Sequence, residues 1–542
     1  TEVYYLPGKT IYGTQFRTYS TAQTRTAAHA KLDYKPAPAH KLTWYGGYMD
    51  MKEQQVRDMA DEKSGSTRLR YTHQYIFSTT LQGTHHFGSS GLELEWKGAY
   101  SKALSETPDQ AEFNFIGTHI ANTGSATRRW EHNDDRDLAG HLDLRYSHGL
   151  MTYSVGGMYR DKKRGSFFNE YTFDSTTGTA NPQYRGEDWN NFDELKLKPR
   201  PYGNIGDPLN YDATEQIGAA YAMAKAKGKR WDATIGLRAE HTVQGYTLIF
   251  PRDSDPDGEQ RYTDILPSAH FKYEIHPKGR LHLSYNRSVN RPSFFEIVPY
   301  TIINEDYKEK GNPDLEHTVA DNIDLRYEFF PKGSEQVMVG LFYKHLHNPI
   351  EYGLINEGQD TYYKPMNLGN ATNTGVEIDV MKYFKCFGVK ANYTFTHSRI
   401  TTSKRTMQGS EVISVNQSRP LFGQSAHVAN VSLLYKSSRW HWEGQISYGY
   451  TGKRLSDISN WLDDDIWEKG YHRLDLSLEK GFPKAGITLF AKASNLLDTP
   501  VVRIVGRGDH TATVDTPRDN GYVIERKEWH GQSFMLGLRW KL

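Results

Sequence analysis

The segment Asn322-Ile-Asp-Leu-Arg-Tyr-Glu-Phe329 shows the pattern that decides the fold of this 542-residue chain. Its apolar residues, Ile, Leu, Tyr and Phe, alternate with Asn, Asp, Arg and Glu. Because successive side chains of a β-strand point to opposite faces, the segment would have one apolar and one polar surface. The same alternation recurs in residues 231–238, 389–396, 440–451 and 473–479. The sequence therefore predicts a protein built from amphipathic strands.

The composition excludes several other classes of protein. The 66 Lys and Arg residues balance 65 Asp and Glu, whereas a nucleic-acid-binding protein needs a basic surplus to neutralise phosphates. The single cysteine, Cys386, excludes a disulfide framework and any site built from several cysteines. We find no apolar run long enough for a transmembrane helix, and residues 1–10 do not read as a signal peptide. Aromatic residues make up 13% of the chain although the mean hydropathy is only -0.73, which fits half-apolar strands.

Two architectures use such strands. In a soluble sandwich the apolar faces meet in a core, whereas in a membrane barrel they face lipid and the polar faces line the lumen. The lengths of the links separate these alternatives, because short polar links alternate with much longer ones. Residues 35–41, 87–91, 147–150 and 436–439 are short links, and residues 106–138, 165–213, 400–424 and 455–470 are long ones. This asymmetry predicts an all-β fold, a large transmembrane antiparallel β-barrel of about 20–22 strands with short periplasmic turns and long extracellular loops.

The end of the chain supports this prediction. Residues 533–542 alternate again, with Phe534, Leu536, Leu538 and Trp540 on the outward face. We expect this last strand to end on the periplasmic side. Aromatic residues near strand ends are placed where the interfacial belts of a barrel would need them; these residues are Tyr327, Tyr343, Tyr435 and Trp440.

A series of short motifs runs through the second half of the chain. The motif Asn290-Arg-Pro-Ser-Phe-Phe295 is followed by Gly311-Asn-Pro-Asp-Leu315 and then by a strand. The other landmarks are Leu266-Pro-Ser268, Asn348-Pro-Ile350, Asn367, Gly375-Val-Glu-Ile378 and Asn495-Leu-Leu-Asp498. In this order they resemble the barrel of TonB-dependent receptors, over about residues 210–542 and in a style closer to receptors from Bacteroidota than from enteric bacteria.

The resemblance implies a domain organisation and a function. Residues 1–542 would be one receptor-like β-barrel domain, and the plug domain and TonB box of the family, with the first hairpin of the barrel, would be missing from this chain. The family imports scarce nutrients across the outer membrane of Gram-negative bacteria. Its partners would be outer-membrane lipid, TonB–ExbB–ExbD if a plug exists, and a surface lipoprotein. The resemblance leaves siderophore, cobalamin, glycan and peptide open as nutrients.

Two other functions compete with import. A plugless barrel could be a structural subunit or scaffold of an outer-membrane complex. A passive porin is disfavoured, because porins have roughly 16–18 strands and the motifs match another family. An enzyme is not expected, because the sequence contains no G-x-S-x-G, H-E-x-x-H or P-loop motif.

The sharpest candidate for a metal site is the run Asp253-Ser-Asp-Pro-Asp257-Gly258. The carboxylates of Asp253, Asp255 and Asp257 stand at alternate positions, as in the first half of a calcium loop. An EF-hand would have Glu at the twelfth position, where this chain has Asp264, and Pro256 interrupts the run. A solvated acidic turn is therefore the favoured alternative to a loop calcium, and no other cofactor is expected.

Other polar clusters read as solvated surface. The acidic residues 463–465 are interpreted as an exposed loop, although the flanking Trp461 and Trp467 could stack on a carbohydrate. His85 and His86 lie beside a short link, and His345 and His347 share one side of a strand, as lumenal or rim residues would. Residues 291–312 contain no histidine, which argues against haem. No catalytic residue is predicted, and the ligand-binding residues stay undefined.

Overall fold

The computed structural model describes residues 2–6, 10–61, 63–117, 119–176, 197–200, 209–250, 256–303, 308–357, 360–507, 518–519 and 522–541. The described chain is nearly all β, with 81% strand and 2% helix, and its wall is a large antiparallel sheet of 22 strands. The predicted fold class is therefore confirmed. None of the described helices is long and apolar enough to cross a membrane.

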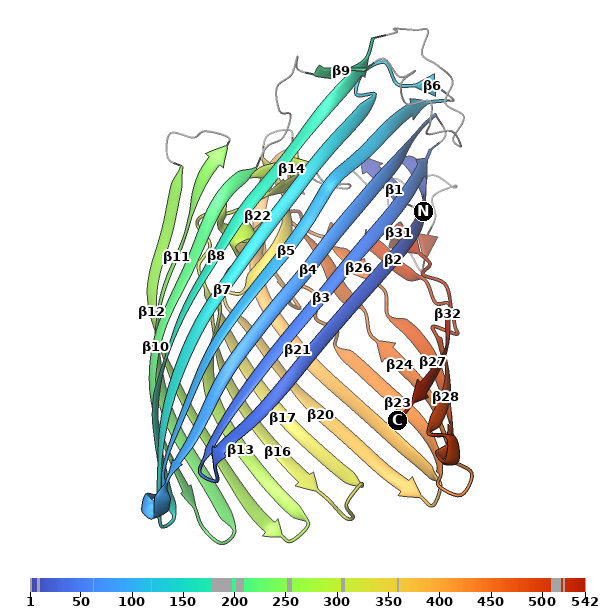
Figure 1. The fold of residues 1–542 in the computed structure, drawn as a ribbon. Helices are drawn as coiled ribbons and strands as arrows, with labels where there is room; N and C mark the ends of the chain where they lie inside the picture. Colours follow the sequence, from blue (N-terminus) through green and yellow to red (C-terminus); the bar gives the residue numbers. More distant parts are fainter. Residues whose placement is uncertain are drawn as a thin grey trace.

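The strands of the wall follow one another in chain order, tilted around a lumen (Figure 1). In spatial order they are β2 (Thr10–Ala37), β3 (His40–Ala60), β4 (Ser64–Phe87), β5 (Leu92–Ile116), β7 (Ala126–His148), β8 (Met151–Ser175), β10 (Asn210–Lys227), β11 (Trp231–Phe250), β12 (Asp257–His276), β13 (Gly279–Asn290), β16 (Thr318–Phe329), β17 (Gln336–His347), β20 (Ala371–Phe384), β21 (Phe387–Gln408), β23 (His427–Ser437), β24 (Trp442–Thr451), β27 (Tyr471–Phe482), β28 (Ile487–Ser494) and β32 (Ser533–Trp540). The short strands β6 (His119–Ile120), β9 (Leu197–Arg200) and β22 (Glu411–Arg419) extend this sheet into the loops.

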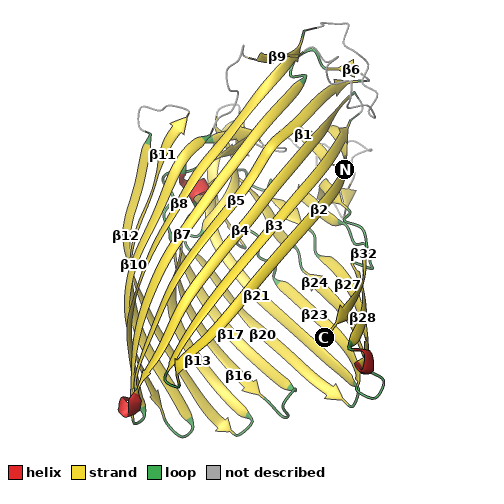
Figure 2. Cartoon of the chain, viewed as in Figure 1, coloured by secondary structure: helices red, strands yellow, loops and turns green. Residues whose placement is uncertain are grey.

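Short turns lie at one end of the barrel and long connections at the other (Figure 2). Two of the turns are short 3-10 segments, η1 (Gly88–Ser90) and η4 (Pro483–Ala485). The turn between β7 and β8 contains Gly149, whose φ of 59° is in the left-handed region that glycine adopts without strain. The predicted alternation of short and long links is therefore present.

The long links are shorter than the sequence predicts. Residues 106–138 read as one long loop, but β5 continues to Ile116 and β7 begins at Ala126. Likewise β21 continues to Gln408 inside the predicted link of residues 400–424. Both strand ends lie beyond the apolar band described below. The end of β21 has no strongly apolar face, so its alternation is lost, whereas Ala111, Phe113 and Phe115 at the end of β5 still alternate with polar residues and form a buried cluster. The wall therefore rises well beyond the part that lipid would cover.

The outer face of the wall is apolar around its middle. Cross-strand pairs such as Leu325 with Leu341 place apolar side chains side by side, and these two are 38% and 50% exposed. In water so much exposed apolar surface would be unfavourable, whereas a bilayer covers it. The exposed outward residues include Leu142, Val155, Ile235, Leu237, Leu283, Ile323, Leu433, Ile446, Phe534 and Leu536. We call this surface the apolar band.

Toward the long-loop end, the same outer face becomes polar. On β4, His73 follows the exposed Phe77 and its neighbour Tyr75 on this face, and on β17, His345 and His347 follow Tyr343. These polar side chains mark the upper edge of the apolar band. Residues beyond it, and the loops, lie outside the membrane-spanning part of the strands.

The largest buried cluster lies in the extracellular part of the lumen. The short helix α1 (Phe294–Ile297) and the residues after it pack on the inner faces of β8, β10 and β11. The members are Phe168, Leu209, Tyr211, Ala213, Tyr246, Leu248, Phe294, Ile297, Val298, Tyr300, Ile302 and Leu315. A barrel wall alone has no core there, so the loop residues supply it.

The long loops are joined to one another by strand pairing. In order of contact, these strands are β14 (Thr301–Ile303), β15 (Lys308–Lys310), β19 (Asp360–Asn367), β18 (Ile350–Glu357), β25 (Arg454–Ser459), β26 (Ile466–Glu468), β29 (Val501–Arg507), β31 (Tyr522–Glu528), β1 (Glu2–Leu6) and β2. The pairs β15–β19 and β18–β25 are parallel and the others antiparallel. We call this continuous series the loop ladder. The ladder joins the β13–β16, β17–β20, β24–β27 and β28–β32 loops. The loop between β21 and β23 is different, because its strand β22 pairs with β21.

Candidate functional site

The loop ladder is fastened to the barrel wall by buried ion pairs. Arg419, at the end of β22, donates from both terminal guanidinium nitrogens to the carboxylate of Glu351 on β18, at 3.1 and 2.9 Å. The side chains are 2% and 3% exposed. The backbone N–H of Phe422 donates to the same carboxylate at 2.8 Å. A buried charge of either sign is unfavourable without its partner, so this pair fixes β18 against the wall.

A second buried pair lies nearby. The Lys404 ammonium on β21 donates to the carboxylate of Asp465 at 2.6 Å and to the carbonyl of Ser459, and these two charged side chains are 1% and 4% exposed. The backbone N–H of Ser459 donates to Asp465 at 2.8 Å. Burial lowers the pKa of Lys404, and Asp465 opposes this shift. A third pair, Arg503 with Asp457, joins β29 to β25.

The motifs that resemble the receptor family attach one loop to the wall. Arg291 donates to the Glu240 carboxylate at 2.5 Å and to the Thr242 hydroxyl at 3.1 Å, both on the inner face of β11. The buried Gln244 amide donates to the carbonyl of Pro292 at 2.8 Å. The Asn290–Phe295 motif is therefore structural: it turns the chain into the lumen and seats α1 there.

The second motif continues the same attachment. The Asn312 side chain donates to the carbonyl of Pro365 at 2.9 Å, and the Gln260 amide donates to the carbonyl of Leu315 at 2.7 Å. Gly311 approaches Val298 so closely that an added Cβ would overlap the Val298 carbonyl oxygen. This contact requires glycine, and it holds the loop between β13 and β16 in place.

Tyrosines are gathered where this loop meets β18 and β19. The rings of Tyr352 and Tyr363 stack with centroids 5.1 Å apart, and the Tyr352 hydroxyl donates to Glu296 at 2.9 Å. Burial raises the pKa of Tyr363 to about 12 and also raises those of Tyr300 and Tyr352. These phenols therefore remain neutral donors at physiological pH.

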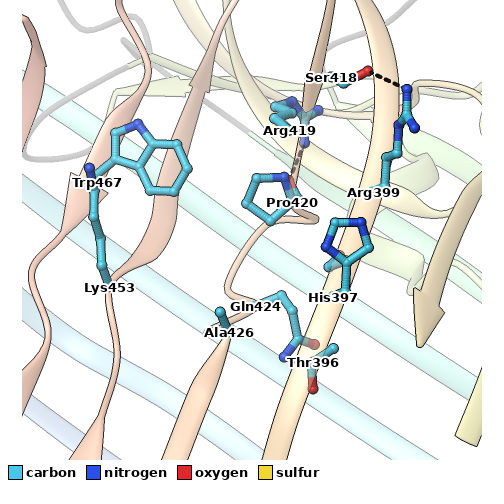
Figure 3. Close-up of a pocket in the computed structure, with 11 residues that line it drawn as sticks. Thr396, His397, Arg399, Ser418, Arg419, Pro420, Gln424, Ala426, Lys453 and Trp467 are labelled. Carbon is cyan, nitrogen blue, oxygen red and sulfur yellow. Dashed lines mark hydrogen bonds between the residues drawn. The ribbon is translucent and has the colours of Figure 1, made fainter. Parts of the chain in front are cut away.

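A pocket of about 460 Å³ opens in the wall where β21 changes its neighbour from β23 to β22 (Figure 3). His397 and Arg399 share the outward face of β21 with the exposed Phe395, and Arg399 donates to the Ser418 hydroxyl at 3.4 Å. Across the pocket, the Lys453 ammonium lies 4.5 Å from the centre of the Trp467 ring. The lining residues are Thr396, His397, Ser398, Arg399, Ser418, Arg419, Pro420, Gln424, Ala426, Lys453 and Trp467. We call this the wall pocket.

A second pocket, of about 280 Å³, lies on the lumenal face nearer the short turns. Its side chains hydrogen-bond across strands: the Asn430 amide donates to Asn392 at 2.9 Å, and the hydroxyls of Ser432 and Ser447 are 2.9 Å apart. The lining residues are Lys390, Asn392, Asn430, Ser432, Gln445, Ser447, Tyr448, Gly449, Arg473 and Asp475. We call this the lumenal patch, a polar surface suited to water or to a polar protein segment.

The calcium-loop candidate lies mostly outside the described residues. Asp253 and Asp255 are not among the described residues. Asp257 is the first residue of β12, and its carboxylate accepts a hydrogen bond of 2.6 Å from the Thr247 hydroxyl. Within the described part of the chain, no group of three or more His, Cys, Asp or Glu side chains is arranged to hold a metal ion.

In the acidic run 463–465, Asp463 is exposed, as the interpretation of a solvated loop predicts, but Asp465 is not. Asp465 is 3% exposed and pairs with Lys404. Local sequence could not reveal this, because the partner is 61 positions away. Arg419 and Glu351 were missed for the same reason; a run of polar strand residues gives no signal of burial.

The histidine pairs have defined positions. His85, beside a short turn, accepts a hydrogen bond of 3.0 Å from the Trp96 indole and lies 3.1 Å from His40. It is therefore part of a ring cluster rather than a free turn residue. The rings of His345 and His347 lie edge to face, with their centroids 4.4 Å apart, at the rim of the outer face. Of the two positions that the sequence predicts, lumenal and rim, the structure has the rim position.

Comparison with known proteins gives the following similarities. Residues 85–540 match the outer membrane protein beta-barrel family. The fold is similar to the siderophore receptor PiuA from Acinetobacter baumannii, with a TM-score of 0.57 and 12% identity over 97% of this chain and 80% of that one. It is similar to the ferric yersiniabactin uptake receptor FyuA from Yersinia pestis, with a TM-score of 0.57 and 12% identity over 98% of this chain and 77% of that one. It is also similar to the ferric-catecholate import receptor Fiu from K12 E. coli, with a TM-score of 0.58 and 11% identity over 97% of this chain and 81% of that one. No curated protein matches the chain.

Proposed function

Because this chain belongs to the outer membrane protein beta-barrel family, we propose that it is the barrel of an outer-membrane receptor that imports a scarce nutrient in a TonB-dependent manner. The family and the fold place the protein in the outer membrane of a Gram-negative bacterium. The fold is that of a transport barrel and not of an enzyme family. Lipid surrounds the apolar band, and the loops face the cell exterior.

The observation that carries this proposal is the loop ladder. The loops of a passive pore need not be joined, whereas here strands from successive loops pair with one another at the extracellular end. The buried pairs of Arg419 with Glu351 and Lys404 with Asp465 attach them to the wall. Opening such an arrangement exposes charges and apolar residues, so it requires binding energy or an external source of work. Energised import supplies both.

The edges of the sheet support a further part of the proposal. All neighbours from β2 to β32 are antiparallel, and both of these strands run toward the short-turn end. Because β2 and β32 run in the same direction, an antiparallel barrel can close between them only through an odd number of additional strands. A single hairpin adds two strands and would therefore leave one parallel pair. We propose that such strands and a plug domain accompany residues 1–542 in the native protein. The polar lumenal patch would then face the plug.

The proposal includes the partners and the nutrient class. A plug would be moved by TonB–ExbB–ExbD, and a surface lipoprotein would assist capture, as in receptors from Bacteroidota. Siderophore, cobalamin, glycan and peptide are all suitable cargo for a wide polar lumen. Iron–siderophore complexes are the first to test, because the structures named above are described as siderophore or iron-complex receptors.

The test is uptake by cells. Cells that carry or lack the native protein are given a panel of labelled iron–siderophores, cobalamin and oligosaccharides, with and without a protonophore. We expect one ligand class to accumulate only in cells with the protein and with an intact proton-motive force. Uptake that persists unchanged after the force is dissipated would contradict energised import.

A further inference from the structure

The short turns at the periplasmic end of the barrel carry a one-sided charge. Each of the six short links between β10 and β28 contains Lys or Arg, whereas the short links β2–β3, β4–β5 and β7–β8 contain no charged residue (Figure 1). Lys541 follows β32 at the same end, where its backbone N–H donates to the Gly486 carbonyl at 2.8 Å. The eight cations are Lys229, Arg230, Lys278, Lys332, Lys385, Arg439, Lys484 and Lys541. We call them the basic arc.

The cations of the basic arc are exposed and have no acidic partner. All eight residues are exposed, and within the described part of the chain none of them forms an ion pair. The single acid in the same links, Glu335, is 4% exposed and pairs with Lys382 at 2.7 Å. Because the whole chain has 66 Lys and Arg against 65 Asp and Glu, an overall basic composition does not explain this surface.

Three exposed cations toward the opposite end of the barrel are compensated. Arg136 lies 3.1 Å from Asp134, and Lys163 lies 3.6 Å from Asp161. Arg261 lies 2.5 Å from the glutamate two positions before it. These side chains form pairs with little net charge, whereas the basic arc presents net positive charge to its surroundings.

One turn has a lysine where the backbone favours glycine. Lys385 has a φ of 56°, a left-handed conformation that glycine adopts without strain and that a residue with a Cβ does not. In the turns after β7 and β27, the positions with positive φ are occupied by Gly149 and Gly486. The conformation of the turn therefore does not account for Lys385, which indicates a role for its charge.

Exposed aromatic side chains adjoin the basic arc. Phe384 and Phe387, 59% and 60% exposed, are register partners on either side of the turn that contains Lys385. The guanidinium carbon of Arg439 lies 5.3 Å from the centre of the Trp440 ring. Exposed aromatic rings at the ends of barrel strands are typical of the membrane–water interface. The cations beside them therefore lie at the level of the lipid head groups.

This position and this charge suit the phosphate groups of lipids. Basic side chains next to a bilayer are attracted to anionic lipids, and the attractions of several such side chains add. The basic arc is also spread over successive turns and is not gathered into one patch. A protein partner would meet only a few of its cations, whereas the lipid that surrounds a barrel meets all of them.

We propose that the basic arc binds the phosphate groups of anionic phospholipids in the periplasmic leaflet of the outer membrane. Because the short links between β2 and β8 are uncharged, these lipids gather along the side of the barrel from β10 to β32. The site does not depend on which nutrient is imported. A soluble phosphate ester shares the charge chemistry, but only a lipid also covers the aromatic rings beside the arc.

Native mass spectrometry of the native protein, released from detergent micelles, tests this preference. The probes are dioleoyl phosphatidylglycerol and dioleoyl phosphatidylcholine, which share their chains and a phosphate but differ in net charge. We expect phosphatidylglycerol to be retained with at least about tenfold preference, and glycerol phosphate at millimolar concentration not to displace it. In the variant Lys278→Gln, Lys385→Gln, Lys484→Gln the preference should fall at least about fivefold, the contribution of one lysine near an anionic surface.

The variant Arg136→Gln, Lys163→Gln, Arg261→Gln is the matched control, because it removes three exposed cations toward the other end. It should keep the preference of the unmodified protein. The slower migration of unheated, folded barrel in gels checks that each variant is folded. Equal retention of the two lipids by the unmodified protein would overturn the proposal, as would an equal loss in the two variants or displacement by glycerol phosphate.

Peptidoglycan is the probe for a partner of another class, because its peptides carry carboxylates. We expect the unmodified protein and the variant of the basic arc to sediment equally with purified sacculi. If the variant lost sedimentation with sacculi but kept its lipid preference, the basic arc would bind the cell wall and the proposal would be wrong.

Discussion

At the scale of residues, the buried pair of Arg419 and Glu351 controls how firmly the loops are held. Removing one partner of a buried ion pair costs about 3–5 kcal/mol, because the other charge is left without compensation. For Glu351→Gln we expect the amides of β18 and β22 to exchange hydrogen about a hundredfold faster, which corresponds to roughly 3 kcal/mol of local opening. Hydrogen–deuterium exchange in lipid nanodiscs measures this.

Glu443→Gln is the control for that variant. Glu443 pairs with Lys436 at 2.6 Å, but the side chains are 56% and 61% exposed. Exposed pairs contribute at most about 1 kcal/mol, so this variant should leave exchange in β18 and β22 unchanged. If the β18 and β22 amides exchanged hydrogen at similar rates in the two variants, the buried Arg419–Glu351 pair would not be what holds these strands in place.

His73 gives a pH-dependent prediction. The imidazole contacts Asp50 at 2.6 Å and Glu106 at 3.0 Å, and Glu106 also lies 3.4 Å from His132. The hydrogen bond with Asp50, followed by that with Glu106, raises the pKa of His73 above its ordinary value of 6.5. Stabilisation by protonated His73 is therefore complete below that value and is lost as the pH rises through the folded-state pKa.

His73→Gln tests this sign. The variant should unfold at a lower temperature than the unmodified protein at about pH 5.5, and at nearly the same temperature well above the folded-state pKa of His73. Thermal unfolding followed by gel mobility at the two pH values measures the difference. A difference in unfolding temperature that does not change with pH would show that the charge of His73 does not contribute.

At the scale of elements, Gly311 sets the position of the loop between β13 and β16. In Gly311→Ala the new Cβ would overlap the carbonyl oxygen of Val298, and backbone atoms cannot move aside as a flexible side chain can. We expect faster proteolysis of this loop in the folded barrel. Gly333→Ala is the control, because a Cβ there meets nothing within 4 Å. Equal cleavage of the two variants would contradict this account of the motif.

The loop ladder can be locked at one of its parallel pairings. Leu354 on β18 is the register partner of Ser459 on β25, a spacing that suits a disulfide. The native Cys386 lies in a short turn at the opposite end. In the variant Leu354→Cys, Ser459→Cys we expect oxidation to stop nutrient uptake and reduction to restore it. Uptake at the same rate in both redox states would show that these strands need not separate.

At the scale of the whole molecule, the sequence predicts the wall better than the site. Residues 322–329 and 440–451 alternate strictly, and the strands β16 and β24 cover them with a shift of two residues at Trp440. Within the apolar band each face meets one environment, so local sequence carries the information. Above the band the polarity of each face depends on contacts with the loops, so the alternation is lost at the end of β21 but persists at Ala111, Phe113 and Phe115 of β5.

The loop ladder could not be predicted in this way. Its contacts join residues far apart in the chain, such as Glu351 with Arg419 and Lys404 with Asp465, separated by 68 and 61 positions. Nothing in the local composition distinguishes a buried Asp465 from the exposed Asp463 beside it. The motifs of residues 290–295 and 311–315 did mark a family-like loop, but the structure was needed to show that they anchor it.

We propose that the paired loops are held together at the extracellular end and that a path for the nutrient opens only when it is driven. The most direct measurement is the conductance of the native protein in a planar bilayer. We expect no steady ion current through the unmodified protein, because the loops are joined to one another and the proposed plug occupies the lumen. A steady, porin-like current through the unmodified protein would contradict the claim.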